Sequence, residues 1–337
     1  MTDLSEGLAF SDAHDSRISP LYQSGLLKSE ALAQWRALYQ DGASVNRLTV
    51  YSLGLPPFDL KRPNPPAHFE DVIAFFIQLR HAVRSTEDPL DRGEESASIS
   101  VPIFGLETPH ILQSDLSTLR RLDQVGVRVV SIAHQLHNAF VIPGEGDRLY
   151  TLGPSLLTPR SRLSVEGRRL IERLETLKMI IDLSHLPERV LMETLDHASA
   201  SALLLASHSG ARRICAHKRN LSDDALRAIS ARGGLVAVGF HSPHLRCHQS
   251  AATIDDLVKH ISHLINTVGI DKVALGSDWG GRIHPPEGLS GPEDLYKLTR
   301  ALQLRGLTSE QIHAVTYGNF ARLLKRQAQL RVARGIE

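Results

Sequence analysis

The chain has 337 residues, of which 42% are hydrophobic and 22% charged, and this composition excludes a chain whose main state is disorder. Its 38 Lys and Arg residues nearly balance 37 Asp and Glu residues, so the formal charge is +1 and a nucleic-acid partner held by bulk charge is excluded. No run of about 18 apolar residues occurs, so we expect no membrane-spanning helix and no membrane partner.

The N-terminus and the cysteines bear on the location of the protein. The stretch MTDLSEGLAF lacks a basic segment and a long apolar run, so we expect no signal peptide. Cys215 and Cys247 are too few for a disulfide framework, so we expect a cytoplasmic protein in which Cys215 is a small buried residue. The 17 histidines are many for this length, and histidine is the commonest metal ligand and acid–base group.

Eight short apolar runs, rich in β-branched residues, predict eight buried parallel strands. In chain order they cover residues 8–10, 48–51, 100–104, 127–132, 179–183, 202–206, 235–238 and 272–275. Because helical patterns lie between them, we predict an α/β fold, a (β/α)8 TIM-type barrel of the metal-dependent hydrolase kind. We expect a single domain over residues 1–337 with loop insertions and a core from about residue 8 to about residue 326.

The helical patterns carry two clear start signals. Thr253 and Thr308 each stand three residues before a side chain that completes a capping box, which predicts a helix start at both places. His260 and His263 fall on the first of these helices, and we expect both to be solvated. Segments 54–66, 140–160 and 280–292 are rich in Gly and Pro, which predicts loops.

Side chains with metal-binding chemistry follow most of the predicted strands, and in a barrel these strand ends converge on one pocket. Each side chain alone has a plain explanation as a solvated rim residue or a helix cap. Their coincidence across several strands favours a site for Zn²⁺ or a similar divalent ion. The residues are Asp12, His14, Glu107, His134, His185, His208 and Asp278.

Two further stretches are less specific. The histidine-rich segment 240–248 matches no zinc-binding spacing, so we interpret it as a polar loop in which His241 lines the pocket. The basic stretch 212–219 is either a solvated loop or an anchor for a substrate carboxylate, a task that suits the geometry of Arg.

Six motifs occur in one order along nearly the whole chain: DAH at residue 12, GLE at 105, IDLSH at 181, ASHS at 206, HKRNL at 217 and LGSD at 275. In order and spacing they resemble the membrane (renal) dipeptidase family of zinc peptidases. The resemblance implies a metallo-dipeptidase that hydrolyses a dipeptide or dipeptide-like amide with a metal-activated water. It also implies a homodimer.

The resemblance implies a role for each matching residue. His14 and Glu107 would hold one metal ion, and Glu107, His185 and His208 the other. His134 would contact the oxyanion of the addition intermediate, and Asp278 would carry the proton from the attacking water to the leaving amine. The implied substrate-binding residues are Arg219, which would hold the C-terminal carboxylate, and Asn138, with His241 from the pocket.

The chain departs from the family pattern in its first strand, where Ser16 occupies the position of an aspartate ligand. Alternation along a strand directs His14 and Ser16 into the barrel and Asp15 away from it. A hydroxyl is a poor substitute for a carboxylate on a divalent ion, so we expect one or two zinc ions per chain, with the first site weakened. Whether a local bulge brings Asp15 to the metal stays open.

Three hypotheses follow for function. The first is hydrolysis of a small peptide-like substrate. The second, motivated by Ser16, is a specialised biosynthetic enzyme of the same fold, with a single-metal or metal-poor site, acting on a peptide-derived natural-product intermediate. The third is a non-catalytic binding protein, against which the presence of Asp278 and Arg219 counts.

Overall fold

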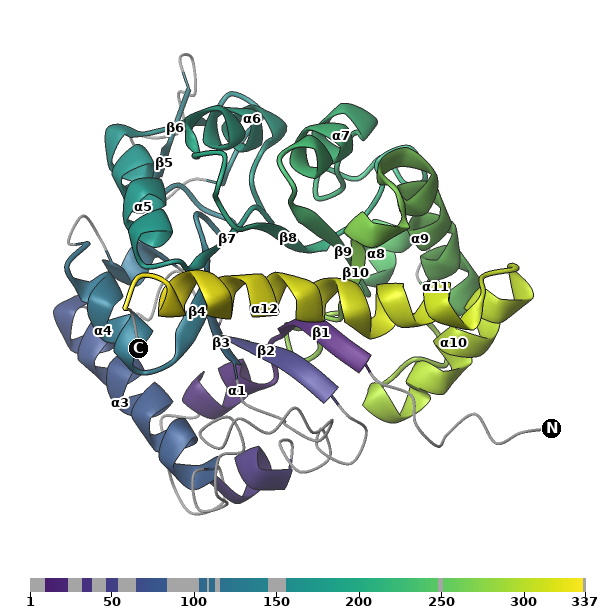
Figure 1. The fold of residues 1–337 in the computed structure, drawn as a ribbon, viewed down its shortest axis with the longest axis horizontal. Helices are drawn as coiled ribbons and strands as arrows, with labels where there is room; N and C mark the ends of the chain where they lie inside the picture. The colour runs from purple at the N-terminus through teal and green to yellow at the C-terminus, as the bar shows by residue number, and fades with distance from the viewer. Residues whose placement is uncertain are drawn as a thin grey trace.

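Within the residues that it describes, the computed structural model forms an eight-stranded parallel sheet that curls into a barrel (Figure 1). Those residues are 10–23, 32–37, 47–53, 65–83, 103–107, 109–112, 116–144, 156–247 and 251–335. Around the barrel the strands are β1 Phe10–Asp15, β2 Arg47–Leu53, β3 Ile103–Leu106, β4 Val127–Ser131, β7 Ile180–Asp182, β8 Leu204–Ser209, β9 Leu235–Gly239 and β10 Val273–Gly276. This order follows the chain, so the predicted barrel is confirmed.

β1 and β10 lie beside each other and close the barrel. The backbone N–H of Asp278 donates to the carbonyl oxygen of His14 at 2.8 Å. The backbone N–H of Ser277 donates to the carboxylate of Asp12 at 2.8 Å, and its hydroxyl donates to the same carboxylate. These bonds bring His14 and Asp278 together at the carboxyl end of the barrel.

Helices surround the barrel, and a short hairpin of β5 Val141–Ile142 and β6 Arg162–Leu163 lies outside the main sheet. Both predicted capping boxes are present, with the side chains of Thr253 and Thr308 each accepting from the backbone three residues on. The helices are α1 Ile18–Gln23, α3 Pro65–Val83, α4 Thr118–Gln124, α5 Val165–Thr176, α6 Glu188–His197, α7 Asp223–Ala231, α8 Ser242–Leu245, α9 Ile254–Val268, α10 Leu295–Leu304, α11 Ser309–His313 and α12 Asn319–Val332.

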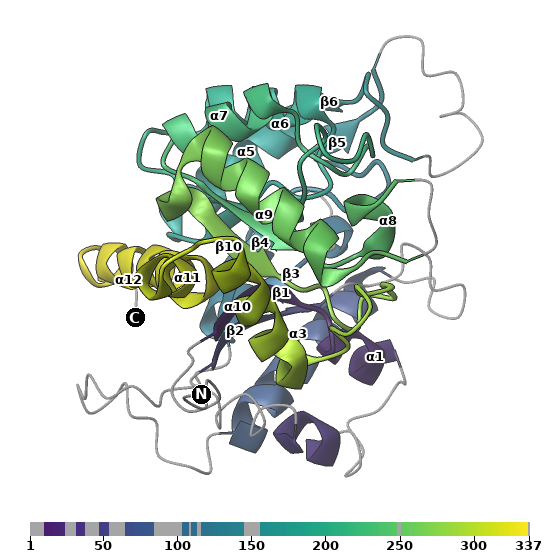
Figure 2. The same ribbon diagram turned by 90° about the vertical axis from the view of Figure 1, so that its right-hand side faces the viewer.

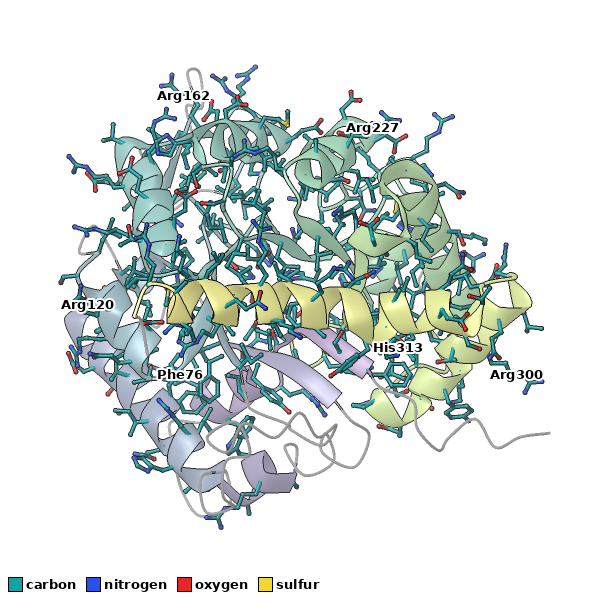
Figure 3. All side chains as sticks on the ribbon, viewed as in Figure 1. Phe76, Arg120, Arg162, Arg227, Arg300 and His313 are labelled. Carbon is teal, nitrogen blue, oxygen red and sulfur yellow. A yellow bond between two sulfur atoms is a disulfide. The ribbon has the colours of Figure 1, made fainter. Side chains whose placement is uncertain are left out.

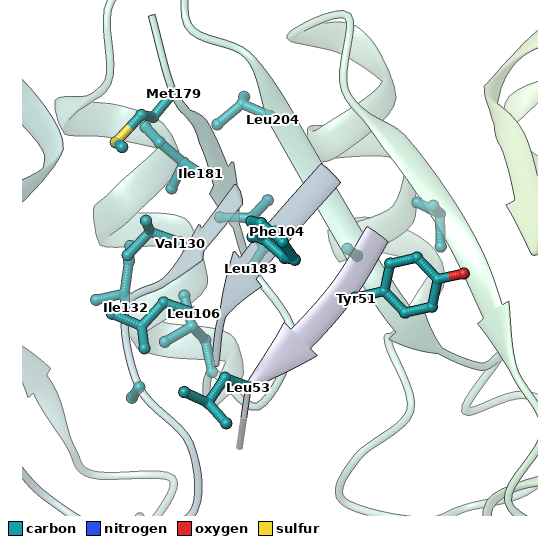
Figure 4. Close-up of a cluster of buried hydrophobic side chains, with 14 of the residues drawn as sticks. Tyr51, Leu53, Phe104, Leu106, Val130, Ile132, Met179, Ile181, Leu183 and Leu204 are labelled. Atoms are coloured by element: carbon teal, nitrogen blue, oxygen red, sulfur yellow. The ribbon is translucent and has the colours of Figure 1, made fainter. Parts of the chain in front are cut away.

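Outward-facing strand residues form the larger apolar core, between the barrel and the helices. Figure 4 shows part of it, where side chains of β2, β3, β4 and β7 pack together. The fully buried Phe76 of α3 contributes to this core, whereas arginines such as Arg120, Arg227 and Arg300 lie at the periphery (Figure 3).

A second apolar cluster fills the inside of the barrel. Its strand residues include Ala13, Val50, Val129, Ile180, Leu205, Ala237 and Ala274. Phe320 and Leu323 of α12 pack against them, so this helix closes the end at which the strands begin. Figures 1 and 2 show α12 crossing that end of the barrel.

Alternate residues of a strand face the same side, so in every strand except β1 the next inward residue lies two positions further along. These next inward residues are small or polar. Gly276 shows why size matters here: a Cβ at this position would lie 1.7 Å from the carbonyl oxygen of Ser207. This layer places hydrogen-bonding groups directly beneath the carboxyl end. Its residues are Ser52, Gly105, Ser131, Asp182, Ser207, Gly239 and Gly276.

Several strands run further toward the carboxyl end of the barrel than predicted, β1 and β8 by the most residues. β1 reaches Asp15, and of the predicted run only Phe10 belongs to it, since residues 8 and 9 lie outside the described part of the chain. β8 runs on to Ser209, beyond the predicted end at residue 206. An apolar run marks only the part of a strand that faces apolar neighbours on both sides, so it underestimates strands that enter a polar site.

An ion pair between Arg331 and Asp123 joins α12 to α4. Arg331 donates to both oxygens of Asp123, at 2.7 and 3.2 Å, and to the carbonyl oxygen of Leu177, and both charged residues are 6% exposed. Arg128 also contacts Asp123, at 2.9 Å. The buried contacts therefore continue beyond residue 326, where we expected the core to end.

Substitution Arg331→Met should destabilise the fold by about 3 kcal/mol, because it leaves a buried carboxylate with one cation instead of two. Lys325→Met, at an exposed position of the same helix, is the matched control and should change the free energy of unfolding by less than about 0.5 kcal/mol. Urea denaturation measures both, and equal midpoints for the two variants would show that the ion pair does not fasten the helix.

Candidate metal centre and active site

Four histidines converge on one buried carboxylate at the carboxyl end of the barrel. Oε1 of Glu107 lies 2.9 Å from Nε2 of His185, 3.5 Å from Nε2 of His208, and 3.7 Å from Nε2 of both His14 and His134. Glu107 is 6% exposed. The structure thus brings together five of the residues that the sequence predicted for the site.

Bulges in two strands and left-handed backbone at two residues orient several of these side chains. β1 carries one extra residue relative to β2 around His14, and β8 carries one extra residue relative to β9 around His208. Such bulges redirect side chains and occur next to active sites. His185 and Asp278 have φ angles of 70° and 61°, left-handed conformations that cost about 1–3 kcal/mol and persist where the surroundings enforce them.

Opposite charges balance the burial of Glu107 and His14. Burial disfavours a charged Glu107, but His134 and His14 hold the pKa of this carboxyl well below its usual range. Burial also disfavours a charged His14, but Glu107 and Asp278 outweigh it and raise the pKa of His14 to about 9. In this structure the carboxylate and the imidazolium stabilise each other.

Burial favours the neutral form of the other three histidines of the centre. Burial lowers the pKa of His185 and of His208 far below the usual value, and the positive charge of Arg219 lowers both further. Burial also lowers the pKa of His134. Neutral imidazole is the form that binds metal ions, so His185 and His208 are ready to act as ligands at physiological pH.

Asp278 lies against this cluster with its Oδ1 atom 3.8 Å from Nε2 of His14. Burial raises the pKa of Asp278 to about 7, and Glu107 adds to the shift, while His14 and Arg219 oppose it. A carboxyl group that titrates near neutrality can both accept and release a proton during a reaction.

The two alternative first-strand residues, Asp15 and Ser16, occupy different environments. Asp15 is fully buried and faces away from the centre, where its carboxylate accepts from the guanidinium of Arg17 at 2.7–3.0 Å. Ser16 lines the site, with its hydroxyl 3.2 Å from Nε2 of His14. β1 does carry a bulge, but the bulge does not bring Asp15 round to the histidines.

A cavity of about 870 Å³ opens over the centre. Its lining includes the apolar residues Leu156, Pro159, Pro187 and Ile283. The residues predicted for the site that line this cavity are Ser16, Glu107, His134, His185, Arg219, His241 and Asp278.

The predicted substrate-binding residues differ in their placement. Nη2 of Arg219 lies 2.9 Å from Nε2 of His208, at the floor of the cavity. His241 lies in the cavity wall, and burial together with His284 lowers its pKa to about 4. Asn138 is not among the lining residues: its amide oxygen accepts from the backbone N–H groups of Phe140 and Val141, so it shapes a turn.

Sequence reasoning missed the acidic residue beneath the centre. Oδ1 of Asp182 accepts from the backbone N–H groups of Ser184 and Ser207, both at 3.0 Å. Its Oδ2 accepts from the hydroxyls of Ser131 and Ser207, at 2.7 and 2.8 Å. One oxygen of Asp182 lies near His14 and His208. The four donors already occupy the lone pairs of this carboxylate. We therefore interpret Asp182 as a residue that holds the candidate ligands in place and not as a metal ligand.

The donor set fits a divalent metal ion. Nε2 of His185 and Nε2 of His208 lie 2.9 Å apart, and both lie within 3.5 Å of Oε1 of Glu107. Two imidazoles and one carboxylate, with a cavity above them, form a ligand set found in catalytic zinc sites with an open coordination position.

Two predictions about nearby residues, Cys215 and His260, need correction. Cys215 is buried as expected, but it is disulfide-bonded to Cys247, with the Cα atoms 5.3 Å apart. The premise of the cytoplasmic prediction is therefore wrong, and the location stays untested. His260 is buried, not solvated: it accepts from the N–H of Ala211 and contacts the carbonyl oxygen of Leu245. Among the described residues, no helix is long and apolar enough to cross a membrane.

Comparison with known protein families decides the relationship. The model of the membrane dipeptidase family, peptidase family M19, matches residues 78–334. The chain belongs to this family. The matched segment contains most of the candidate site of this M19 member, whereas His14 and Ser16 precede it.

A curated relative agrees with this assignment. A Schizosaccharomyces pombe protein described as the uncharacterized dipeptidase C965.12 is 31% identical over 249 residues, which are 72% of this chain and 57% of that protein. The chain spans about half the length of the curated relatives it matches.

Two solved structures show the same fold. One is a Rhodobacter sphaeroides metallopeptidase liganded with a phosphinate mimic of the dipeptide L-Ala-D-Ala; its TM-score is 0.76 at 21% identity, over 95% of this chain and 99% of that chain. The other is a metallopeptidase called dipeptidase AC, with a TM-score of 0.76 at 23% identity, over 96% of this chain and 99% of that chain.

Proposed function

We propose that this protein is a metallo-dipeptidase that hydrolyses a dipeptide or dipeptide-like amide. The observation that carries the proposal is the convergence of His208 with Glu107 and His185, two residues that line a cavity whose lining also includes Arg219 and Asp278. Membership of the M19 family and the dipeptide mimic bound to the R. sphaeroides relative support the same class of substrate.

The proposal assigns a zinc ion to Glu107, His185 and His208, and a second, weaker position to Glu107 and His14. A bound divalent ion would supply a Lewis acid and a nucleophile at neutral pH. Ser16 supports the distinction between the two positions, because a hydroxyl replaces the carboxylate that would complete the weaker one.

The other residues bind the substrate and move its protons. Arg219 is suited to hold a C-terminal carboxylate, because its guanidinium donates from the cavity floor. His134 faces the same cavity and would stabilise negative charge on the carbonyl oxygen under attack. Asp278 would take a proton from the attacking water and give it to the leaving amine, a role that its pKa near 7 supports. Homodimerisation remains a proposal that rests on the family resemblance alone.

Ser16 also supports a second candidate function, a specialised enzyme for a peptide-derived intermediate. The locked Asp15–Arg17 pair supplies no replacement ligand, and the cavity of about 870 Å³ lies at the upper end of the range for pockets that hold drug-sized ligands. This candidate would be favoured if the zinc-loaded protein hydrolysed larger amide conjugates but none of a panel of dipeptides.

Substitution Asp278→Asn should lower the rate of dipeptide hydrolysis by about 10²–10⁴-fold while zinc stays bound, because an amide cannot carry the proton. Asp271→Asn is the matched control, an exposed carboxylate at the opposite end of β10, and should leave the rate unchanged. Steady-state kinetics and elemental analysis measure both quantities. Full activity of Asp278→Asn would remove this residue from the mechanism.

Substitution Ser16→Asp should raise the zinc content per chain, because it places a carboxylate at the residue whose hydroxyl now lies 3.2 Å from Nε2 of His14. Ser16→Asn, of similar size but neutral, is the control and should leave the zinc content at the wild-type level. Elemental analysis after dialysis measures both. Equal zinc content in wild type and both variants would show that residue 16 does not limit the weaker position.

A further inference from the structure

One buried hydroxyl connects Asp182 to two candidate ligands. Oγ of Ser207 lies 2.8 Å from Oδ2 of Asp182, 2.9 Å from Nδ1 of His208 and 3.2 Å from Nδ1 of His14. Ser207 is fully buried in β8, within the polar layer of the barrel. Both rings meet this hydroxyl on the side that faces away from Glu107, so it contacts them from behind the proposed zinc position.

The direction of each hydrogen bond in the path from Asp182 to Arg219 is determined by chemistry. A carboxylate only accepts, so the hydroxyl of Ser207 gives its single proton to Asp182. At the other end a guanidinium only donates, so Nε2 of His208 accepts from Arg219 at 2.9 Å. The ring proton of neutral His208 therefore lies on Nδ1 and is donated to Ser207.

We propose that Ser207, held by Asp182, is a positioning residue that fixes the tautomer of His208. With the ring proton on Nδ1, the lone pair of Nε2 points toward Glu107 and His185, where a metal ion would bind. Hydrogen bonds to the distal nitrogen of a ligating histidine fix its orientation and raise its basicity. The inference rests on the proposed function, since it assigns Ser207 a part in building that metal centre.

His185 provides an internal contrast. Its Nδ1 atom is buried and has no hydrogen-bond partner among the described residues. Its Nε2 lies 2.9 Å from Oε1 of Glu107, which only accepts, so the ring proton of His185 lies on Nε2 in the metal-free protein. His208 and His185 should therefore carry their protons on opposite nitrogens, although both Nε2 atoms face the same site.

Nuclear magnetic resonance of metal-free, histidine-labelled protein tests this directly. Long-range proton–nitrogen correlations distinguish the two tautomers, and His185→Gln and His208→Gln variants assign the signals. The proposal predicts a proton on Nδ1 for His208 and on Nε2 for His185 in the wild-type protein. A proton on Nε2 of His208 would overturn it, whether or not any variant folds.

Zinc affinity, measured by competition with a chromogenic chelator, provides the second readout. Ser207→Ala should weaken zinc binding by about 10–100-fold and add the Nε2–H form of His208. Ser209→Ala is the matched control, because Ser209 lies on the same strand, is 4% exposed and has a hydroxyl without a partner among the described residues. Wild-type affinity and tautomer in Ser207→Ala would reject the proposal.

Substitution Asp182→Asn tests whether Asp182 fixes the tautomer of His208, because Asn has nearly the same side-chain shape as Asp. Its amide N–H groups can donate to Ser131 and Ser207, which reverses the bond to Ser207 and frees the hydroxyl proton to face Nδ1 of His208. The Nε2–H form of His208 should therefore appear. An unchanged tautomer would remove Asp182 from the proposal. Because neither readout uses peptide hydrolysis, wild-type protein that cleaves no dipeptide would refute the proposed function and leave this inference standing.

Discussion

A carboxylate inside a barrel must have its lone pairs occupied, and the candidate site depends on how Asp182 meets this requirement. Two backbone N–H groups and two serine hydroxyls donate to it, from β4, β8 and the turn after β7. An unpaired buried charge would cost several kcal/mol, so these donors determine which residues can occupy the surrounding strand positions. A residue without a side chain is required at position 276, because a Cβ there would overlap the carbonyl oxygen of Ser207 in β8.

The barrel interior has an apolar layer that stabilises the fold and a polar layer that supports the candidate site. α12 and the apolar layer close one end of the barrel, while the polar layer supports histidines at the other. Bulges in β1 and β8 and left-handed backbone at His185 and Asp278 concentrate irregular geometry at this second end. The rigid apolar end thus allows the opposite end to hold converging polar side chains.

Apolar runs were enough to predict the barrel, and polar residues at their ends were enough to predict Glu107, His185 and His208 as neighbours. The contribution of Asp182 was missed because its role depends on donors from three other segments. The Cys215–Cys247 bond joins residues 32 apart and becomes visible only when two loops meet. Asn138 was assigned to substrate from resemblance, but its amide is used by the local turn.

The position of a bound zinc ion distinguishes most directly between Glu107 and Asp182 as the carboxylate ligand. Crystals of zinc-loaded protein, measured at wavelengths on either side of the zinc absorption edge, would give an anomalous map of the bound metal. We expect the strongest peak to lie next to Glu107, His185 and His208, with Asp182 outside the coordination sphere. A zinc ion bound by His14, Asp182 and His208 would contradict this expectation, because Asp182 would then be a metal ligand and not the residue that holds Ser207 in place.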